Sequence, residues 1–308
     1  MNIHCNNCDF LFDTSMSQPY GVCPNCHQEQ APEITGSFID VFELAALLGS
    51  GNNGEVFLAR HEFLHNEVAL KLLNRDQEND KVAVTRFFRE SRAAARLNHP
   101  NIVQAVAAGK THSGRRFFAM ELVLGEAIDA RLWRLGTPYY GEVLLIAAKI
   151  ADALNYAWQC CKFIHGDIKP GNIIIMESNG EPKLVDLGLA RFYGEEFDGE
   201  LMATPLYAPP EVIRWEIGKI DFRSDMYSFG AMLYELFSGT PPFPGSDPEK
   251  VYQAQLNEIA VSLKDRGCLR EGLSDLIDQM LAKNPEDRPV SWAIVADMLR
   301  TYRLEILS

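Results

Sequence analysis

The sequence has no long uncharged apolar run, no excess of basic residues, and no tandem repeats or low-complexity segments. Its most apolar windows, such as Val143 to Leu154, are interrupted by Lys149 and Asp152, so we expect no membrane-spanning helix. The N-terminus begins with polar and cysteine residues rather than a signal peptide, and we therefore expect a cytoplasmic protein. The 29 Lys and Arg against 42 Asp and Glu give a net charge of -13, which argues against nucleic acid or an anionic membrane as the main partner.

The composition is typical of a globular protein, with 47% hydrophobic and 23% charged residues. The 308 residues are enough for about two domains of ordinary size, and a core of this extent needs no disulfides. Seven cysteines are present, and four of them lie within the first 26 residues. We expect the other three, Cys160, Cys161 and Cys268, to be reduced and partly buried. Redox activity of the adjacent Cys160 and Cys161 is the less favoured alternative.

The four N-terminal cysteines form two C-x-x-C pairs, Cys5 with Cys8 and Cys23 with Cys26. This spacing predicts a tetrahedral Zn²⁺ site, with two disulfides or free thiols as the alternative. The segment 1–30 resembles a zinc ribbon, and it is so short that metal binding would supply most of its folding free energy. We expect it to serve as a structural cap or as a docking site for a protein partner, with a redox or metal sensor as the less favoured role.

A short polar segment, residues 164–175, lies between two apolar runs and is expected to be a loop held by core on both sides. It carries Asp167, Lys169 and Asn172, and a second acid follows at Asp186. Transfer of a phosphoryl group needs a carboxylate base, oxygen ligands for Mg²⁺ and a fixed positive charge. This segment supplies all of these groups.

At these residues the chain resembles the protein kinase family, whose catalytic loop reads H-R-D-x-K-x-x-N and whose metal-binding turn reads D-F-G. The resemblance implies that Asp167 orients the substrate hydroxyl as the base and that Lys169 neutralises the transferred phosphoryl group. It also implies that Asn172 and Asp186 hold Mg²⁺. The I-K-P that follows the aspartate and the T-P-L-Y at 204–207 resemble the serine/threonine branch of the family.

Three positions depart from the family pattern. Gly166 stands where Arg is usual, Leu187 where Phe is usual, and Pro209 where Ala is usual. Gly166 removes the cation that normally pairs with a phosphorylated activation loop, and the segment from Leu189 to Ala203 contains no Ser or Thr. We therefore expect that phosphorylation of this loop does not control activity. Leu187 keeps an apolar side chain at the position of the usual Phe.

The glycine-rich stretch 49–54 matches G-x-G-x-x-G, a pattern that dinucleotide-binding folds share. Here Val56 to Ala59 continues as a strand rather than a helix, and Glu67 to Lys71 follows as another strand. This order indicates a hairpin flap over ATP phosphates, as in kinases. By resemblance, Met120 is the gatekeeper in the strand that ends at the hinge. The expected ATP-contacting residues are Gly49, Ser50, Gly51, Gly54, Val56, Ala69, Lys71, Met120, Glu121, Val123 and Ile174.

Lys71 resembles the family lysine that pairs the α and β phosphates. Its expected partner is Glu90, in a predicted helix over 84–97 whose inward face carries Phe87, Glu90 and Ala94. A solvated Glu90 paired with an arginine of its own helix is the alternative. The resemblance also implies scaffold contacts. They are Asp225 with the catalytic-loop backbone, Arg288 with Glu211, and His165 within the core. The place of Thr204 beside Pro205 suggests a hydroxyl that bonds the Asp167 and Lys169 region, with phosphorylation of Thr204 as the alternative.

The sequence therefore predicts an α+β, bilobal protein-kinase-like fold over 38–303, with a β-rich N-lobe over about 38–121 and a helical C-lobe over about 122–303. The module 1–30 and a linker 31–37 precede it. The expected function is that of a serine/threonine protein kinase using ATP and Mg²⁺, most similar to the eukaryotic-like kinases of bacteria, with Zn²⁺ in the N-terminal module. A pseudokinase that acts as a nucleotide-dependent scaffold through the ribbon is the alternative, and a small-molecule kinase is a third option.

Overall fold

The computed structural model describes residues 2–4, 11–13, 38–51, 54–111, 114–135, 139–195 and 203–307. Contacts divide the chain into two compact units, one formed by Met1–Val84 with Val106–Leu122 and the other by Thr85–Ala105 with Val123–Ser308. The stretch 85–105, which the sequence assigns to the first lobe, thus groups with the second unit. Contacts to that unit explain the grouping, because the Arg96 guanidinium lies over the Phe192 ring and the Asn98 N–H donates to Tyr156 Oη.

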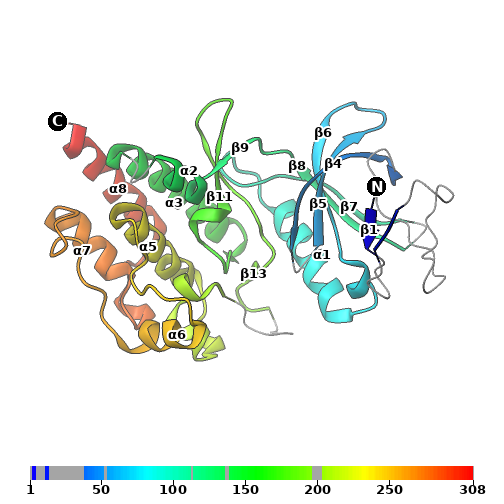
Figure 1. Cartoon of the computed structure of the whole chain (residues 1–308). Helices are drawn as coiled ribbons and strands as arrows, with labels where there is room; N and C mark the ends of the chain where they lie inside the picture. The colour runs from blue at the N-terminus through cyan, green and yellow to red at the C-terminus, as the bar shows by residue number, and fades with distance from the viewer. Residues whose placement is uncertain are drawn as a thin grey trace. The chain divides into compact units, whose positions relative to one another are not determined.

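The first unit is built on a sheet, and Figure 1 labels its strands β4 to β8. The strands lie in the order β3-β4-β5-β6-β8-β7, with antiparallel pairing from β3 to β8. Its strands are β3 (Phe38–Ile39), β4 (Phe42–Gly51), β5 (Gly54–His61), β6 (Glu67–Leu72), β7 (Ala105–Lys110) and β8 (Arg116–Glu121). Alternating apolar residues form one buried core, in which the rings of Phe42 and Phe117 meet edge to face at 5.9 Å.

The hairpin of β4 and β5 is the predicted glycine-rich flap, and Gly51 pairs with Gly54 at its tip. Gly54 has a φ of 145°, and a Cβ at this position would collide with the carbonyl oxygen of Leu72. Only glycine therefore allows β5 to begin so close to the end of β6.

The helix α1 (Lys81–Arg96) contains neither Gly nor Pro, and its residues Phe87, Glu90 and Ala94 are buried as predicted. The short helix η2 (Arg75–Gln77) precedes α1. Near the N-terminus, β1 (Asn2–His4) pairs antiparallel with β2 (Leu11–Asp13).

The second unit is mainly helical, which together with the first unit confirms the predicted α+β class. Its α-helices are α2 (Ile128–Leu135), α3 (Tyr140–Cys161), α4 (Pro210–Ile213), α5 (Phe222–Ser238), α6 (Pro248–Asn257), α7 (Glu271–Met280) and α8 (Trp292–Leu307). Its 3-10 helices are η3 (Pro170–Asn172), η4 (Pro205–Tyr207), η5 (Ile217–Lys219) and η6 (Pro285–Asp287). The helix α5 is buried on all sides from Ser224 to Tyr234, which makes it the centre of the core.

Short strands bracket the segment 164–175. The strand β10 (Phe163–Ile164) pairs with β13 (Arg191–Phe192), and β11 (Ile173–Met176) lies between β9 (Gly125–Ala127) and β12 (Pro182–Leu184). The apolar residues on both sides of the segment are buried, among them Phe163, Ile164 and Ile173. The polar loop is therefore held from both ends, as the sequence predicts.

The predicted zinc ligands Cys5, Cys8, Cys23 and Cys26 lie outside the described residues, and the zinc site stays a prediction. In the described ranges, no cluster of three or more His, Cys, Asp and Glu side chains is arranged to hold a metal ion. No described helix is both long enough and apolar enough to cross a bilayer.

The remaining cysteines are free thiols. Cys161 and Cys268 are partly buried as predicted, whereas Cys160 at the end of α3 is exposed. Burial, together with the neighbouring Cys160, raises the pKa of the Cys161 thiol to about 11. Little thiolate therefore forms at neutral pH, which argues against a redox role for this pair.

Candidate active site

Asp225, near the start of α5, anchors the backbone of the predicted catalytic loop. Its carboxylate accepts the N–H of His165 at 2.7 Å and that of Gly166 at 2.8 Å, as expected. Burial raises the pKa of Asp225, while His165 and the two N–H donors oppose that rise. The Asp225 side chain of the buried helix α5 thus holds the main chain of the loop.

His165 is fully buried and is a packing residue, as predicted. Its Nδ1 accepts the N–H of Asp167 at 3.3 Å, and its Nε2 lies 3.3 Å from the carbonyl oxygen of Val185. These contacts are satisfied when Nδ1 is the acceptor and Nε2 the donor. The ring thereby ties the loop to the residue that precedes Asp186.

Asp167, the predicted base, lies at the centre of a hydrogen-bonded cluster. Its Oδ2 accepts from Lys169 Nζ at 2.6 Å and from Asn172 Nδ2 at 3.1 Å, and its Oδ1 accepts the Thr204 hydroxyl hydrogen at 2.6 Å. Burial alone would raise the pKa of Asp167. The bonds from Lys169 and Thr204 outweigh burial, so the pKa lies below its usual value and the group is a carboxylate at neutral pH.

Asn172 and Asp186, the predicted Mg²⁺ ligands, are joined through the backbone, because Val185 N donates to Asn172 O at 2.9 Å. The Asn172 side-chain nitrogen also donates to the Asp167 carbonyl oxygen at 2.7 Å, which leaves the amide oxygen as the atom that could hold a metal. Asp186 is exposed and has a φ of 58°, a region that Asp tolerates better than most residues. Both side chains offer the hard oxygen donors that suit Mg²⁺.

Leu187, the residue after Asp186, is almost fully buried, so an apolar side chain fills this position as predicted. The departure at Gly166 has a steric reason. Gly166 has a φ of 80°, and a Cβ there would lie 2.8 Å from the carbonyl oxygen of Leu189. An arginine at this position would require the backbone of both residues to move.

The predicted ATP-contacting residues of the first unit occupy adjacent strands of its sheet. Lys71 on β6 lies opposite Val56 on β5 and Phe118 on β8, and Ala69 lies opposite Met120. The remaining residues of this set are Gly49, Ser50 and Gly51 on β4, Gly54 on β5 and Glu121 on β8.

Lys71 is 7% exposed in the first unit, and Glu90 is 4% exposed in the second. Their pairing stays a prediction, as does the adenine-binding role of Val123 and Ile174, which also belong to the second unit.

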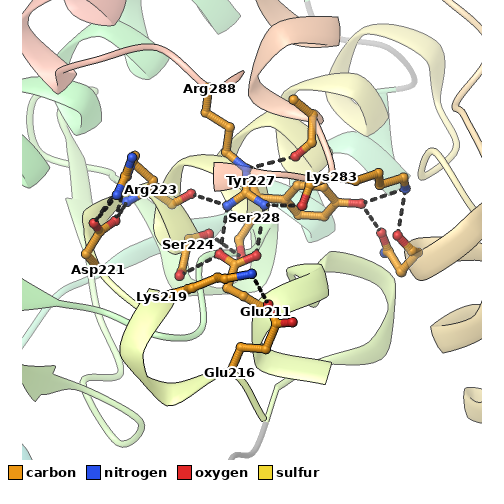
Figure 2. A network of polar contacts seen from close by, with 12 residues as sticks. Glu211, Glu216, Lys219, Asp221, Arg223, Ser224, Tyr227, Ser228, Lys283 and Arg288 are labelled. Atoms are coloured by element: carbon orange, nitrogen blue, oxygen red, sulfur yellow. Dashed lines mark hydrogen bonds and ion pairs between the residues drawn. The ribbon is translucent and has the colours of Figure 1, made fainter. Parts of the chain in front are cut away.

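Glu211 and Arg288 form the predicted ion pair, and both side chains are completely buried (Figure 2). Two parallel bonds join them, at 2.7 Å from Arg288 Nη1 to Oε1 and at 2.8 Å from Nη2 to Oε2. The Ser224 hydroxyl donates to the same carboxylate at 2.7 Å. The pair therefore fastens α4 to the start of α5 and to the loop before α8. Pro209 fits directly before α4, where its extended backbone serves as the N-cap.

The sequence did not reveal two further features. The first is a cavity of ≈ 300 Å³ that Arg86, Arg89 and Arg191 help to line. Burial and the nearby charge of Arg89 lower the pKa of Arg191, although Asp225 opposes the change. Arg86 and Arg89 lie three residues apart on one helix, which indicates a basic face, but nothing in the sequence brings Arg191 to them. The second feature is the completely buried side-chain amide of Gln255.

The sequence matches the family described as Protein kinase domain over residues 42–299. It is 34% identical over 263 residues to serine/threonine-protein kinase pkn3 of Myxococcus xanthus, covering 81% of this chain and 48% of that protein. It is 35% identical over 275 residues to serine/threonine-protein kinase PknB of Mycobacterium leprae, covering 85% and 43%.

A DNA damage-responsive serine/threonine-protein kinase, RqkA of Deinococcus radiodurans, is 32% identical over 276 residues, covering 86% of this chain and 40% of that protein. The matched region thus makes up somewhat less than half the length of these curated relatives.

Proposed function

Since the chain belongs to the protein kinase domain family, we propose that it transfers the γ-phosphoryl group of ATP to Ser or Thr hydroxyls of protein substrates. The observation that carries this proposal is the buried Asp167 carboxylate, which Lys169, Thr204 and Asn172 hold in one orientation. Its lowered pKa keeps it able to accept a hydrogen bond from an incoming hydroxyl at neutral pH.

In the proposed reaction the substrate hydroxyl oxygen forms a bond to the γ-phosphorus while the bond to the ADP oxygen breaks, and the hydroxyl proton passes toward Asp167. Lys169 donates to Asp167 at 2.6 Å, so its cation lies beside the carboxylate and can neutralise charge on the transferred group. Asn172 and Asp186 would hold Mg²⁺, which supplies charge neutralisation on the phosphates when bound. Lys71 would pair the α and β phosphates.

The pseudokinase alternative rests on the departures at Gly166, Leu187 and Pro209. Gly166 lacks the cation that is usual at its position, but the charged and amide groups of the proposed chemistry are all retained, namely Lys71, Glu90, Asp167, Asn172 and Asp186. Leu187 fills its buried position and Pro209 fits its N-cap position. The names of the similar proteins favour a serine/threonine kinase over a small-molecule kinase.

The test is incubation of the protein with Mg²⁺ and γ-radiolabelled ATP in the presence of basic proteins and small metabolites, followed by phosphosite mapping. Label on Ser or Thr of a protein supports the proposal, and label only on metabolites contradicts it. Asp186→Asn and Lys71→Met should abolish transfer, because each removes charge aimed at metal or phosphate. Lys250→Met is the matched control, since Lys250 is an exposed lysine of α6.

We also propose that phosphorylation of the segment after Asp186 does not switch the enzyme on. The segment from Leu189 to Ala203 has Tyr193 as its only hydroxyl, and Gly166 carries no cation. Initial rates should therefore stay within a few-fold after phosphatase treatment, with Tyr193→Phe as the control. A loss of about tenfold, or 1.4 kcal/mol of barrier, would contradict this.

For the N-terminal module we propose a Zn²⁺ site formed by Cys5, Cys8, Cys23 and Cys26. We also propose that this module binds a protein partner. The spacing of the two C-x-x-C pairs supports the metal, and four thiolate ligands require a reducing compartment such as the cytoplasm.

A further inference from the structure

The backbone of residues 203–207, which we call the Thr204 segment, is held by side chains of α5 and α6. Gln255 Nε2 donates to the carbonyl oxygens of Pro205 at 3.2 Å and Leu206 at 2.9 Å. Ser228 Oγ donates to Tyr207 O at 2.9 Å. The Tyr252 hydroxyl donates to Ala203 O at 3.4 Å. Gln255 thus makes two of these bonds, at the centre of the segment.

The orientation of the Gln255 amide is determined by its surroundings. Gln255 is completely buried, and its Oε1 accepts the Tyr227 hydroxyl hydrogen at 2.5 Å. A flipped amide would place its oxygen against two carbonyl oxygens, which repel it. Both N–H donors and the acceptor are therefore used, and removing the donors would leave two buried carbonyl groups without these partners.

A cation supports this amide from the other side. Lys283, which lies beside Tyr227 in Figure 2, donates from Nζ to Tyr227 Oη at 3.3 Å. The same Nζ donates to the backbone oxygen of Gln255 at 2.6 Å. Because Tyr227 Oη accepts from Lys283, its own hydrogen is directed at Gln255. Each group in this series donates to the next: Lys283 donates to Tyr227, Tyr227 to Gln255, and Gln255 to the Thr204 segment.

The Thr204 segment ends this chain of bonds at the predicted base. Pro205, whose carbonyl Gln255 binds, directly follows Thr204, and Thr204 O accepts the Tyr207 N–H at 3.0 Å. The Thr204 hydroxyl donates to Asp167 Oδ1 and accepts from Lys169 Nζ at 3.1 Å. A shift of the backbone at Pro205 therefore moves a hydroxyl that contacts Asp167.

We propose that Gln255 is a positioning residue that sets the Thr204 hydroxyl on Asp167 by binding the Pro205 and Leu206 carbonyl oxygens. This inference rests on the proposed kinase function. Gln255 acts through Thr204 and does not itself touch the substrate, so its loss should slow phosphoryl transfer and leave ATP binding unchanged. A residue that only packs would instead lower stability without this selective effect on kcat.

The experiment compares two variants of Gln255 in the full chain. Gln255→Glu keeps the length and the acceptor for Tyr227 but replaces both N–H donors by oxygen, whereas Gln255→Met removes every side-chain hydrogen bond at similar volume. Each should lower kcat by about tenfold or more, since small misplacements of catalytic groups have large effects on rate. KM for ATP should stay within about twofold. Gln253→Met, on the exposed face of the same helix, should change neither quantity.

A double-mutant cycle shows whether Gln255 acts through Thr204. If it does, Gln255→Met should cost little further kcat in a Thr204→Val background. Losses that multiply, or a Gln255→Met variant with wild-type kcat, would overturn the inference while leaving the proposed function intact. A wild-type protein that transfers no phosphate would overturn both. If Gln255→Glu does not fold, the kcat of Gln255→Met and the double-mutant cycle still test the inference.

Discussion

Thr204 and Asp167 are separated by 37 positions in the sequence, yet the Thr204 hydroxyl donates to Asp167 Oδ1 at 2.6 Å. The same hydroxyl oxygen accepts from Lys169 Nζ at 3.1 Å, so one neutral hydroxyl joins the acid and the cation of the site. This bond holds the Asp167 carboxylate in one orientation.

The first prediction follows from that bond. Thr204→Ser keeps the hydroxyl and should retain kcat within about threefold, whereas Thr204→Val keeps the shape and should lower kcat by about tenfold or more. Steady-state rates at saturating ATP provide the measurement. Equal rates for the two variants would show that the hydroxyl has no part in orienting Asp167.

The second prediction concerns the buried ion pair of Glu211 and Arg288. Arg288→Met leaves a buried carboxylate without its cation and should lower the free energy of unfolding by about 3–5 kcal/mol. Arg300→Met removes an exposed partner of Asp152 and should cost at most about 1 kcal/mol. Urea denaturation of both variants tests this. Similar costs at the two sites would show that burial does not decide how much each ion pair contributes.

The third prediction separates the two reasons for glycine at position 166. Gly180→Ala, at a φ of 72° in open space, should cost about 1 kcal/mol through backbone strain alone. Gly166→Ala should cost clearly more, because the added Cβ also meets the carbonyl oxygen of Leu189. Gly218→Ala, which has neither constraint, should be neutral. Thermal unfolding ranks the three, and a neutral Gly166→Ala would refute the steric explanation.

The fourth prediction concerns pH. Burial, aided by the charge of Arg288, lowers the pKa of Lys283 to about 8. The charged form is therefore disfavoured in the folded protein. This penalty is present below that pKa and disappears as pH rises toward the ordinary lysine value. From about pH 8 to pH 10 the unfolded state binds more protons, so Lys283 should make the protein more stable as pH rises.

The measurement for Lys283 is the free energy of unfolding at several pH values between about 8 and 10. Lys283→Met should remove part of the rise seen in the wild type, although it lowers overall stability by deleting the bond to Gln255 O. Parallel pH profiles for the two proteins would show that the lysine keeps its ordinary pKa.

The fifth prediction is that protein purified under reducing conditions carries one equivalent of Zn²⁺. Cys8→Ser should lose the metal, because three thiolates hold it far less well than four. Cys268→Ser should retain it, since Cys268 lies far from the N-terminal pairs in the sequence. Elemental analysis decides, and zinc-free wild-type protein would argue against the ribbon.

The sequence predicted the contacts that the family resemblance implies and the elements that follow from local pattern. The pairing of Glu211 with Arg288 and the contact of Asp225 with the loop backbone were implied by the resemblance, and the structure has both. The face of α1 with Phe87 and Glu90 followed from helical periodicity.

Contacts between neutral groups could not be predicted from the sequence. Gln255 belongs to a short helix whose neighbouring glutamine, Gln253, is exposed, and nothing in the pattern separates the two. Its partners are backbone carbonyl oxygens, which every residue has. The grouping of 85–105 with the second unit was missed for a similar reason, because it depends on ring and backbone contacts such as that of Arg96 with Phe192.

The bonds that hold the Thr204 segment end on main-chain oxygens at positions 203, 205, 206 and 207. Their donors lie on α5 and α6, outside the segment. The side chains of Ala203 and Leu206 can therefore change without loss of these hydrogen bonds, provided that the hydroxyl at position 204 remains. Both side chains are partly buried, so packing limits their replacement, while the main-chain bonds keep the Thr204 hydroxyl on Asp167.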